Sequence, residues 1–300
     1  MNETVRADSI AALTAVEQDL RTQALNQLRQ IRAIEGYVQL AAAETQIGCW
    51  RAYSLCEQLF GPPQLPAPPV REIPASALDG FTMGGQAEIE DGYLDATYPG
   101  NWPIIYTDHE IDLYLKKIAR RETHIYGMTD VWMWDAIAQF PIKGKSVVNM
   151  GSLTPWYEAN CLYYGAESTT IDYNPILARS TRVKTMTVAE WDRDQPTFDV
   201  AWSISSFEHD GLGMYGDPID PEGDLKAMQK MKRIVKPGGL LFLALPVGRD
   251  KVRFNAARVY GRLRLPLLMK GWEQLATFGL EPVHLDGPGH IQPVFVLRNV

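Results

Sequence analysis

The sequence predicts an α/β protein whose C-terminal half holds a parallel sheet with helices on both faces. Two observations support this. From residue 145 onward, short apolar runs alternate with helix-like segments, which is the pattern of strands joined by crossover helices. The composition, 46% hydrophobic and 22% charged, is that of an ordinary globular protein able to bury a full core. The expected strands are Ser146–Met150, Ser168–Asp172, Val183–Val188, Phe198–Ile204, Leu240–Leu245, Pro282–Leu285 and Pro293–Leu297.

Charge and cysteine usage exclude several classes of partner. The 300 residues carry a net charge of −7, whereas proteins that bind nucleic acid or anionic lipid usually present a basic surface. The cysteines Cys49, Cys56 and Cys161 have no metal-ligand spacing, which favours a reducing compartment. We find no apolar run of about 18 residues and no basic-then-apolar N-terminal signal. We therefore expect a soluble cytoplasmic protein with no nucleic-acid partner and no membrane span.

The N-terminal half divides at a proline-rich connector. Five prolines fall within residues 61–69, and such a run favours an extended, semi-rigid chain. Before it, apolar residues over 8–60 recur at three- and four-residue steps, which predicts an amphipathic helix packed on its own domain or a coiled-coil segment for homo-oligomerisation. The expected domains are a helical segment over 1–60, a linker over 61–70, a helical and irregular lid or cap over 71–142, and the α/β domain over 143–300.

Three strand ends carry residues suited to a nucleoside. Gly151 follows the first strand and lets a ligand or a tight turn approach the backbone. Asp172 ends the second strand, where a carboxylate can accept hydrogen bonds from ribose hydroxyls or can cap the next helix. After the third strand, Glu190 can bond an adenine amino group and Trp191 can lie on its face, although a solvated acidic turn explains them equally well.

The loop after the fourth strand is the most informative segment. It contains Glu208 and His209, followed by acids and glycines, at the sheet edge where α/β proteins place their ligands. Glu208 and His209 can act as an oriented general base. A metal site of His209, Asp210 and Asp217 and a purely structural strand end remain open as alternatives. After the fifth strand, Arg258 and Tyr260 can clamp an anionic or hydroxylated substrate or lie on the surface.

Together these segments resemble class I S-adenosylmethionine-dependent methyltransferases. The resemblance covers roughly residues 143–300 and rests on the Gly151 turn, on Asp172, on Phe198-Asp199-Val200 and on Lys236-Pro237-Gly238-Gly239. It implies a Rossmann-like α/β sheet, mostly parallel with an antiparallel last strand, with the N-terminal helical segment as an extension. More narrowly, the segments Gly151–Glu158, Ser206–Pro218 and Phe254–Gly261 are similar to the domain of unknown function 268 family, DUF268.

The resemblance implies S-adenosylmethionine as cofactor and assigns roles by position. The implied catalytic residues are His209 and Glu208, with no metal ligands. The implied cofactor-binding residues are Gly151, Ser152, Glu158, Asp172, Tyr173, Glu190, Trp191 and Ser205. The implied substrate-binding residues are Asp210, Tyr215, Asp217, Asn255, Arg258 and Tyr260. One departure stands out, because Asn149 lies in the opening strand where the family has an acid, so Glu158 or an N-terminal acid would replace it.

Three functions follow as hypotheses. The first is O-methylation of a small-molecule or glycan hydroxyl, with His209 taking the proton. The second is a metal-dependent transferase or hydrolase that uses the loop from His209 to Asp224. The third is a non-catalytic binding or scaffolding protein on a methyltransferase-like domain, which Asn149 favours.

Overall fold

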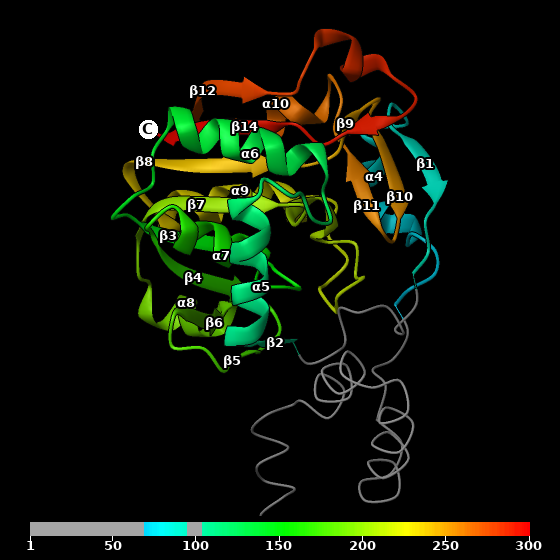
Figure 1. The fold of residues 1–300 in the computed structure, drawn as a ribbon. Helices are drawn as coiled ribbons and strands as arrows, with labels where there is room; N and C mark the ends of the chain where they lie inside the picture. The colour runs from blue at the N-terminus through cyan, green and yellow to red at the C-terminus, as the bar shows by residue number, and fades with distance from the viewer. Residues whose placement is uncertain (1–68, 95–103) are drawn as a thin grey trace, which may run out of the picture. The chain divides into compact units, whose positions relative to one another are not determined.

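A computed structural model describes residues 69–94 and 104–300 (Figure 1). The chain divides into two units, residues 1–63 with 102–105 and residues 64–101 with 106–300. The site and its surroundings belong to the second unit. The expected helical segment over 1–60, and the linker up to residue 68, lie outside the described residues.

The second unit is organised around a seven-stranded sheet with the order β12-β14-β8-β7-β3-β4-β6. β3, β4, β6, β7 and β8 run parallel, and β14 runs antiparallel to β8 and β12. This is the strand order of the class I methyltransferase fold, so the expected fold class is confirmed. The strands are β3 (Ser146–Met150), β4 (Glu167–Asp172), β6 (Val183–Thr187), β7 (Phe198–Ile204), β8 (Val235–Ala244), β12 (Trp272–Phe278) and β14 (Val294–Asn299).

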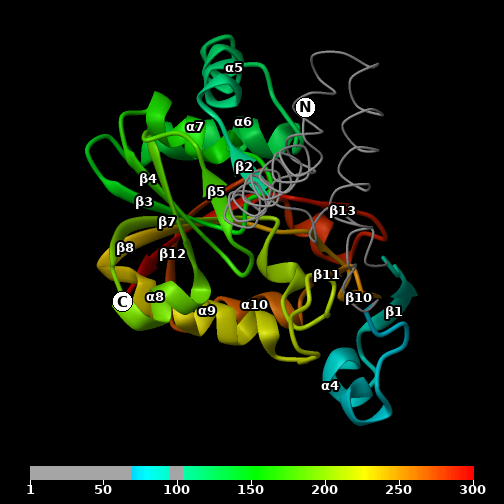
Figure 2. The ribbon, with the colours of Figure 1, turned by 90° about the horizontal axis from the view of Figure 1, so that it is seen from below.

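Helices cover both faces of this sheet. Figure 2 shows α6 and α7 on one face, with α5 packed outside α7, and α8, α9 and α10 on the opposite face. The central strands are therefore buried on both sides, and Val148, Ala201 and Leu241 are fully inaccessible to solvent. The helices are α5 (Asp108–Ala119), α6 (Met128–Gln139), α7 (Trp156–Tyr163), α8 (Val188–Asp194), α9 (Gly223–Ile234) and α10 (Arg264–Leu268).

Smaller elements lie beside the carboxyl edge of the sheet (Figure 1). A three-stranded sheet, β1-β10-β11, joins residues before and after the fourth-strand loop, and Phe81 packs against Phe254 beneath it. The remaining elements are η1 (Ala75–Ala77), α4 (Leu78–Thr82), β1 (Glu88–Asp91), β2 (Ile104–Tyr106), β5 (Ile176–Ala178), η3 (Phe207–His209), β9 (Val247–Gly248), β10 (Lys251–Phe254), β11 (Ala257–Val259), η4 (Pro282–Asp286) and β13 (His290–Ile291). None of the described helices is long and apolar enough to cross a membrane.

One expected strand is wrong. The run from Pro282 to Leu285 forms the short helix η4, which begins at a proline and is capped by reciprocal bonds between Glu281 and His284. The sixth strand along the chain is instead β12, whose residues Glu273 and Gln274 are exposed. An edge strand with polar side chains lacks the apolar run by which the central strands were recognised.

Candidate functional site

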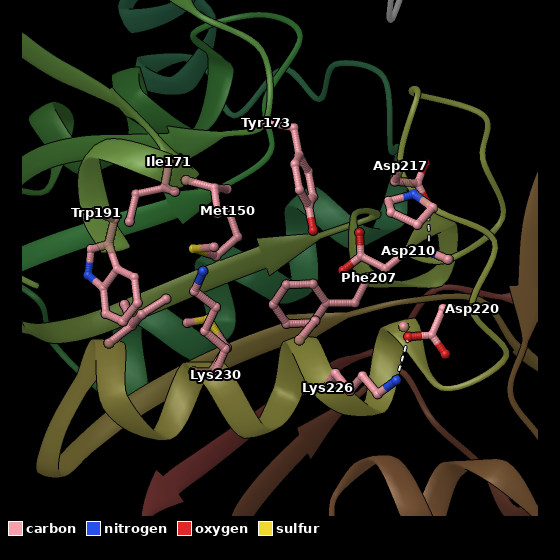
Figure 3. Close-up of a pocket in the computed structure, with 17 residues that line it drawn as sticks. Met150, Ile171, Tyr173, Trp191, Phe207, Asp210, Asp217, Asp220, Lys226 and Lys230 are labelled. Atoms are coloured by element: carbon pink, nitrogen blue, oxygen red, sulfur yellow. Dashed lines mark hydrogen bonds and ion pairs between the residues drawn. The ribbon is translucent and has the colours of Figure 1, made fainter. Parts of the chain in front are cut away.

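A pocket of about 260 Å³ opens at the carboxyl ends of β3 and β4 and extends between the sheet and α9 (Figure 3). Its interior is apolar, and its open side carries acids and lysines. The apolar lining comes from Met150, Ile171, Val188, Trp191, Phe207, Ala227, Met231 and Ile234. The polar lining comes from Tyr173, Asp210, Asp217, Asp220, Lys226 and Lys230. A largely apolar group with polar substituents at one end matches this lining.

The mouth of the pocket holds an acid whose charge is suppressed. Figure 3 shows the Tyr173 hydroxyl pointing toward the Asp210 carboxyl. Burial raises the pKa of Asp210 well above its ordinary value, and the nearby Asp217 carboxylate raises it further, although Arg258 opposes both effects. The Asp210 carboxyl therefore stays protonated to higher pH than an ordinary acid and can donate a hydrogen bond into the pocket.

Two lysines from α9 line the opposite side of the mouth. Lys226 is paired with Asp220 at 2.6 Å. Lys230 is paired with Asp192 at 2.8 Å, and its ammonium lies 5.0 Å from the centre of the Trp191 ring. These pairs hold the lysine side chains along the rim, so α9 contributes both apolar floor and charged edge to the pocket. The sequence pattern did not single out this helix as part of the site.

The turn after β3 brings Gly151 against the ends of two other strands. Gly151 has a φ of +63°, and a Cβ atom there would lie 2.7 Å from the Ser206 Oγ and 3.8 Å from an Asp172 oxygen. Asp172 accepts a hydrogen bond from the Asn174 amide at 2.8 Å. Burial raises the pKa of Asp172, while backbone donors that include the Ser152 amide oppose that rise. Glycine is therefore favoured at this turn, because another residue would adopt the left-handed conformation and displace the Ser206 hydroxyl, and Asp172 binds backbone amides beside it.

The residues expected to supply an acid for the cofactor face the interior. Asn149 is 3% exposed, and its amide donates to Ser168 at 3.0 Å. Glu158 is fully buried beneath the Gly151 turn, where it contacts hydroxyl groups of Thr170 at 2.5 Å and Ser152 at 3.3 Å. Burial raises the pKa of Glu158 to about 7. This carboxyl supports the turn from below, in contrast to the expected contact with a ligand above it.

The loop after β7 is held by two oppositely charged side chains. Asp217 accepts hydrogen bonds from the amides of Gly211 at 2.6 Å, Gly213 at 3.2 Å and Tyr215 at 3.3 Å. The loop's carbonyl groups converge instead on the Arg258 guanidinium. Its partners there are the carbonyl oxygens of Glu208, Asp210, Asp220 and Pro221. The Asp217 carboxylate thus accepts from backbone amides of the loop, and the Arg258 guanidinium donates to its carbonyl groups. These bonds give the loop's backbone groups the partners that regular structure would otherwise supply.

His209 is fixed in one tautomer by the turn between β10 and β11. Its Nδ1 lies 2.5 Å from the carbonyl oxygen of Ala256, and because a carbonyl only accepts, Nδ1 carries the hydrogen. Nε2 then has a free lone pair and lies 3.8 Å from Glu208 Oε1. Glu208 is 1% exposed and accepts from the Ser205 hydroxyl at 2.6 Å, while its Oε2 has no hydrogen-bond partner among the described residues. The imidazole can therefore accept a proton beside a buried carboxylate.

Three residues expected to bind substrate are buried among the protein's own groups. Arg258 is 1% exposed, and Tyr260 is fully buried with its hydroxyl donating to Asp224 at 3.0 Å. Asn255 is fully buried and exchanges two hydrogen bonds with the backbone of Leu94. Apart from Arg258 Nε, which lies 3.8 Å from Asp224 without a hydrogen bond, these polar groups have protein partners, so the geometry gives the three residues structural roles. Asp210, Asp217 and the ring of Tyr215, which meets His209 edge-on at 5.5 Å, do lie around the loop.

The remaining expected residues divide between the pocket and the surface. Trp191 and Tyr173 line the pocket. Glu190 is exposed and forms a capping box with Thr187 at the start of α8. Ser206, which sequence reasoning passed over, lies against Gly151. No local pattern marks it, because its importance comes from the packing of β7 beside β3.

The open metal alternative finds no support in the loop geometry. Within residues 69–94 and 104–300, no group of three or more His, Cys, Asp or Glu side chains is arranged to hold a metal ion. Asp217, one of the three ligands considered, has its oxygens engaged by backbone amides. The set His209, Asp210 and Asp217 is therefore not a preformed metal site.

We expect Gly211→Ala to disrupt this loop. Gly211 has a φ of +79°, and a Cβ atom would lie 2.0 Å from the carbonyl oxygen of Asp220, a backbone atom that cannot move aside cheaply. The expected loss of unfolding free energy in urea is about 3 kcal/mol or more, from left-handed strain plus overlap. Gly216→Ala is the matched control, because Gly216 has a φ of +85° with nothing within 4 Å. Gly216→Ala should lower the unfolding free energy by about 1–2 kcal/mol. Equal losses in the two variants would contradict the close approach of Gly211 to the Asp220 carbonyl oxygen.

Solved structures to which this chain is similar include methyltransferases. One is 1,6-didemethyltoxoflavin-N1-methyltransferase of Burkholderia thailandensis, with 14% identity, coverage of 66% of this chain and 94% of that chain, and a TM-score of 0.45. Another is the N-methyltransferase NodS of Bradyrhizobium japonicum, with 12% identity, coverage of 57% and 94%, and a TM-score of 0.40. A third is an S-adenosylmethionine-dependent methyltransferase of Mesorhizobium loti, with 13% identity, coverage of 56% and 97%, and a TM-score of 0.38. No curated protein sequence matches the chain.

The family comparison covers the part of the chain that builds the site. Residues 144–285 match the family model described as "Caenorhabditis protein of unknown function, DUF268". This range contains the Gly151 turn, the pocket and the loop that carries Glu208 and His209. The resemblance of residues 144–285 to the DUF268 family is therefore confirmed.

Proposed function

We propose that this protein is an S-adenosylmethionine-dependent methyltransferase that methylates a hydroxyl group of a small molecule or glycan. The observation that carries the proposal is the position of the pocket. It opens at the carboxyl ends of β3 and β4, in a sheet with the class I methyltransferase strand order. Ligands of open α/β sheets bind at that edge.

The residues around the pocket fit the cofactor's adenosine portion. The apolar lining, which includes Trp191 and Ile171, suits a purine ring. Because Gly151 has no side chain, its backbone beside Asp172 is accessible to a ligand, and a Cβ atom there would meet the Ser206 hydroxyl. We assign the cofactor to this turn and pocket, with Tyr173 and Asp210 at the mouth. The net charge of −7 favours a neutral or cationic acceptor over a polyanion.

The chemistry required of the chain is positioning and removal of one proton. When bound, S-adenosylmethionine supplies an electrophilic methyl group. His209 would accept the acceptor hydroxyl's proton at Nε2, since Nδ1 is held by the Ala256 carbonyl. The Glu208 carboxylate, 3.8 Å away, would stabilise the resulting imidazolium. Such a general base typically contributes about 10²–10⁴-fold to the rate.

We expect Ala227→Leu to weaken cofactor binding by at least about tenfold. Ala227 lies on α9 and lines the pocket, so a larger side chain would occupy space that the ligand needs, while alanine and leucine are both good helix formers. Calorimetric titration with S-adenosylmethionine and S-adenosylhomocysteine measures the change. Gln229→Leu is the matched control, because Gln229 is exposed on the same helix.

The outcomes of this titration separate the proposal from its rival. Binding that is weakened by Ala227→Leu and unchanged by Gln229→Leu supports the proposed cofactor site. No binding of either ligand to the unaltered chain contradicts the proposal. It would favour a non-catalytic methyltransferase-like protein, the alternative to which the inward-facing Asn149 points.

A further inference from the structure

Two residues near β11 hold His209 from one side. The carbonyl oxygen of Ala256 accepts the Nδ1 hydrogen of the imidazole at 2.5 Å. Two positions later, Arg258 donates to the carbonyl oxygens on either side of His209, at 2.5 Å to Asp210 and 3.5 Å to Glu208. The ring and the backbone of His209 are therefore fixed by the same short segment, about 50 residues away in sequence.

The burial of Arg258 is costly, and its ion pair with Asp224 accounts for only part of what compensates that cost. Its guanidinium lies above the Phe81 ring at 5.4 Å and meets mostly neutral carbonyl groups. Its charged neighbour Asp224 is 3.8 Å from Nε and is bonded more closely by Arg264 at 2.8 Å. A buried cation is retained only where several hydrogen bonds compensate its desolvation. What Arg258 adds beyond Arg264 is the set of bonds to the carbonyl groups around His209.

We infer that Arg258 is a positioning residue that sets the orientation and tautomer of His209. This inference rests on the proposed function for its catalytic meaning. The planar guanidinium donates in several fixed directions at once, so it can hold the carbonyl groups of residues 208, 210, 220 and 221 in one arrangement. A lysine ammonium is a compact charge and cannot reproduce that arrangement. The role differs from the substrate clamp expected from the sequence, because Arg258 acts through His209 without touching a ligand.

The test compares Arg258→Lys with Arg264→Lys in the full chain, using imidazole ¹⁵N signals from labelled histidine. Arg264 is the matched control, because it is also buried and bonds Asp224 and the Pro221 carbonyl, but no carbonyl group beside His209. The His209 signal, one of five histidines, is identified by its loss in His209→Gln. Arg258→Lys should shift the His209 ring nitrogens away from the pure Nδ1-protonated tautomer. Arg264→Lys should leave them unchanged while lowering the unfolding free energy.

Each outcome decides the inference. Unchanged His209 signals in Arg258→Lys, or equal shifts in both variants, would overturn it and leave Arg258 with a general stabilising role. If Arg258→Lys fails to fold, Phe81→Leu replaces it, since loss of the ring beneath the guanidinium should give a smaller shift in the same direction. Cofactor titration of the same samples separates the two proposals. If the cofactor does not bind but Arg258→Lys gives the expected His209 shift, the methyltransferase function is contradicted and the positioning role of Arg258 is supported.

Discussion

Asp224→Ala should lower the unfolding free energy by about 3–5 kcal/mol, because it leaves two arginines buried without their shared anion. Asp224 is fully buried at the start of α9. It accepts from Arg264 and from the Tyr260 hydroxyl, and Arg258 lies 3.8 Å away. Burial alone would raise the pKa of Asp224, but the two guanidinium groups outweigh it and lower the pKa. The carboxylate is therefore the charge that makes both buried cations tolerable.

Urea denaturation at neutral pH measures this loss, with Asp220→Ala as the control. Asp220 pairs with Lys226 at 2.6 Å, but that pair lies at the surface, and such pairs contribute about 0–1 kcal/mol. The double variant Asp224→Ala with Arg264→Met should lose less unfolding free energy than the sum of the two single variants. The second change removes the Arg264 guanidinium that the first leaves unpaired. A loss for Asp224→Ala as small as that for Asp220→Ala would show that the network does not depend on the buried anion.

The sequence predicted β3 and β7 well, because these central strands read as apolar runs whose residues are mostly buried, whereas β8 begins at Val235, before the expected Leu240. β3 and β7 have the expected bounds, and β4 and β6 differ by one residue at one end. The prediction of the large sheet's sixth strand was wrong, because this strand lies at the edge and has polar side chains. β12 pairs only with β14 and exposes Glu273 and Gln274, while the apolar run beginning at Pro282 forms a short helix instead.

The site was located by sequence more readily than its internal contacts were. Position at a strand end indicated the loop of Glu208 and His209, because chain order and sheet geometry determine where strand ends meet. The partners of that loop could not be read in the same way. Arg258 looked like a surface or ligand-binding cation, since arginines are seldom fully buried. Its actual partners lie between residues 208 and 224, and only tertiary packing brings them together.

The second large effect concerns Glu158 and the pH dependence of stability. Its pKa is raised by burial to about 7 from an ordinary 4.5, so the folded chain binds a proton that the unfolded chain has released between those values. The contribution of Glu158 to the unfolding free energy is fully present below about pH 4.5 and is lost as the pH rises toward about 7. The difference between the two pKa values corresponds to roughly 3 kcal/mol of unfolding free energy. We expect Glu158→Gln to remove this fall, so that the variant is more stable than the unaltered chain at pH 8.

The contacts of Glu158 explain why glutamine should be accepted there. The hydrogen of Ser152 Oγ goes to the Thr154 carbonyl at 2.8 Å, so the 3.3 Å contact between Ser152 Oγ and Glu158 Oε2 is satisfied when the carboxyl supplies the proton. A glutamine amide supplies the same donor at every pH. Urea denaturation at pH 5 and pH 8 measures the difference between variant and unaltered chain, and Glu167→Gln, at a surface ion pair, controls for general charge effects. A difference that is the same at both pH values would mean that Glu158 is ionised beneath the Gly151 turn.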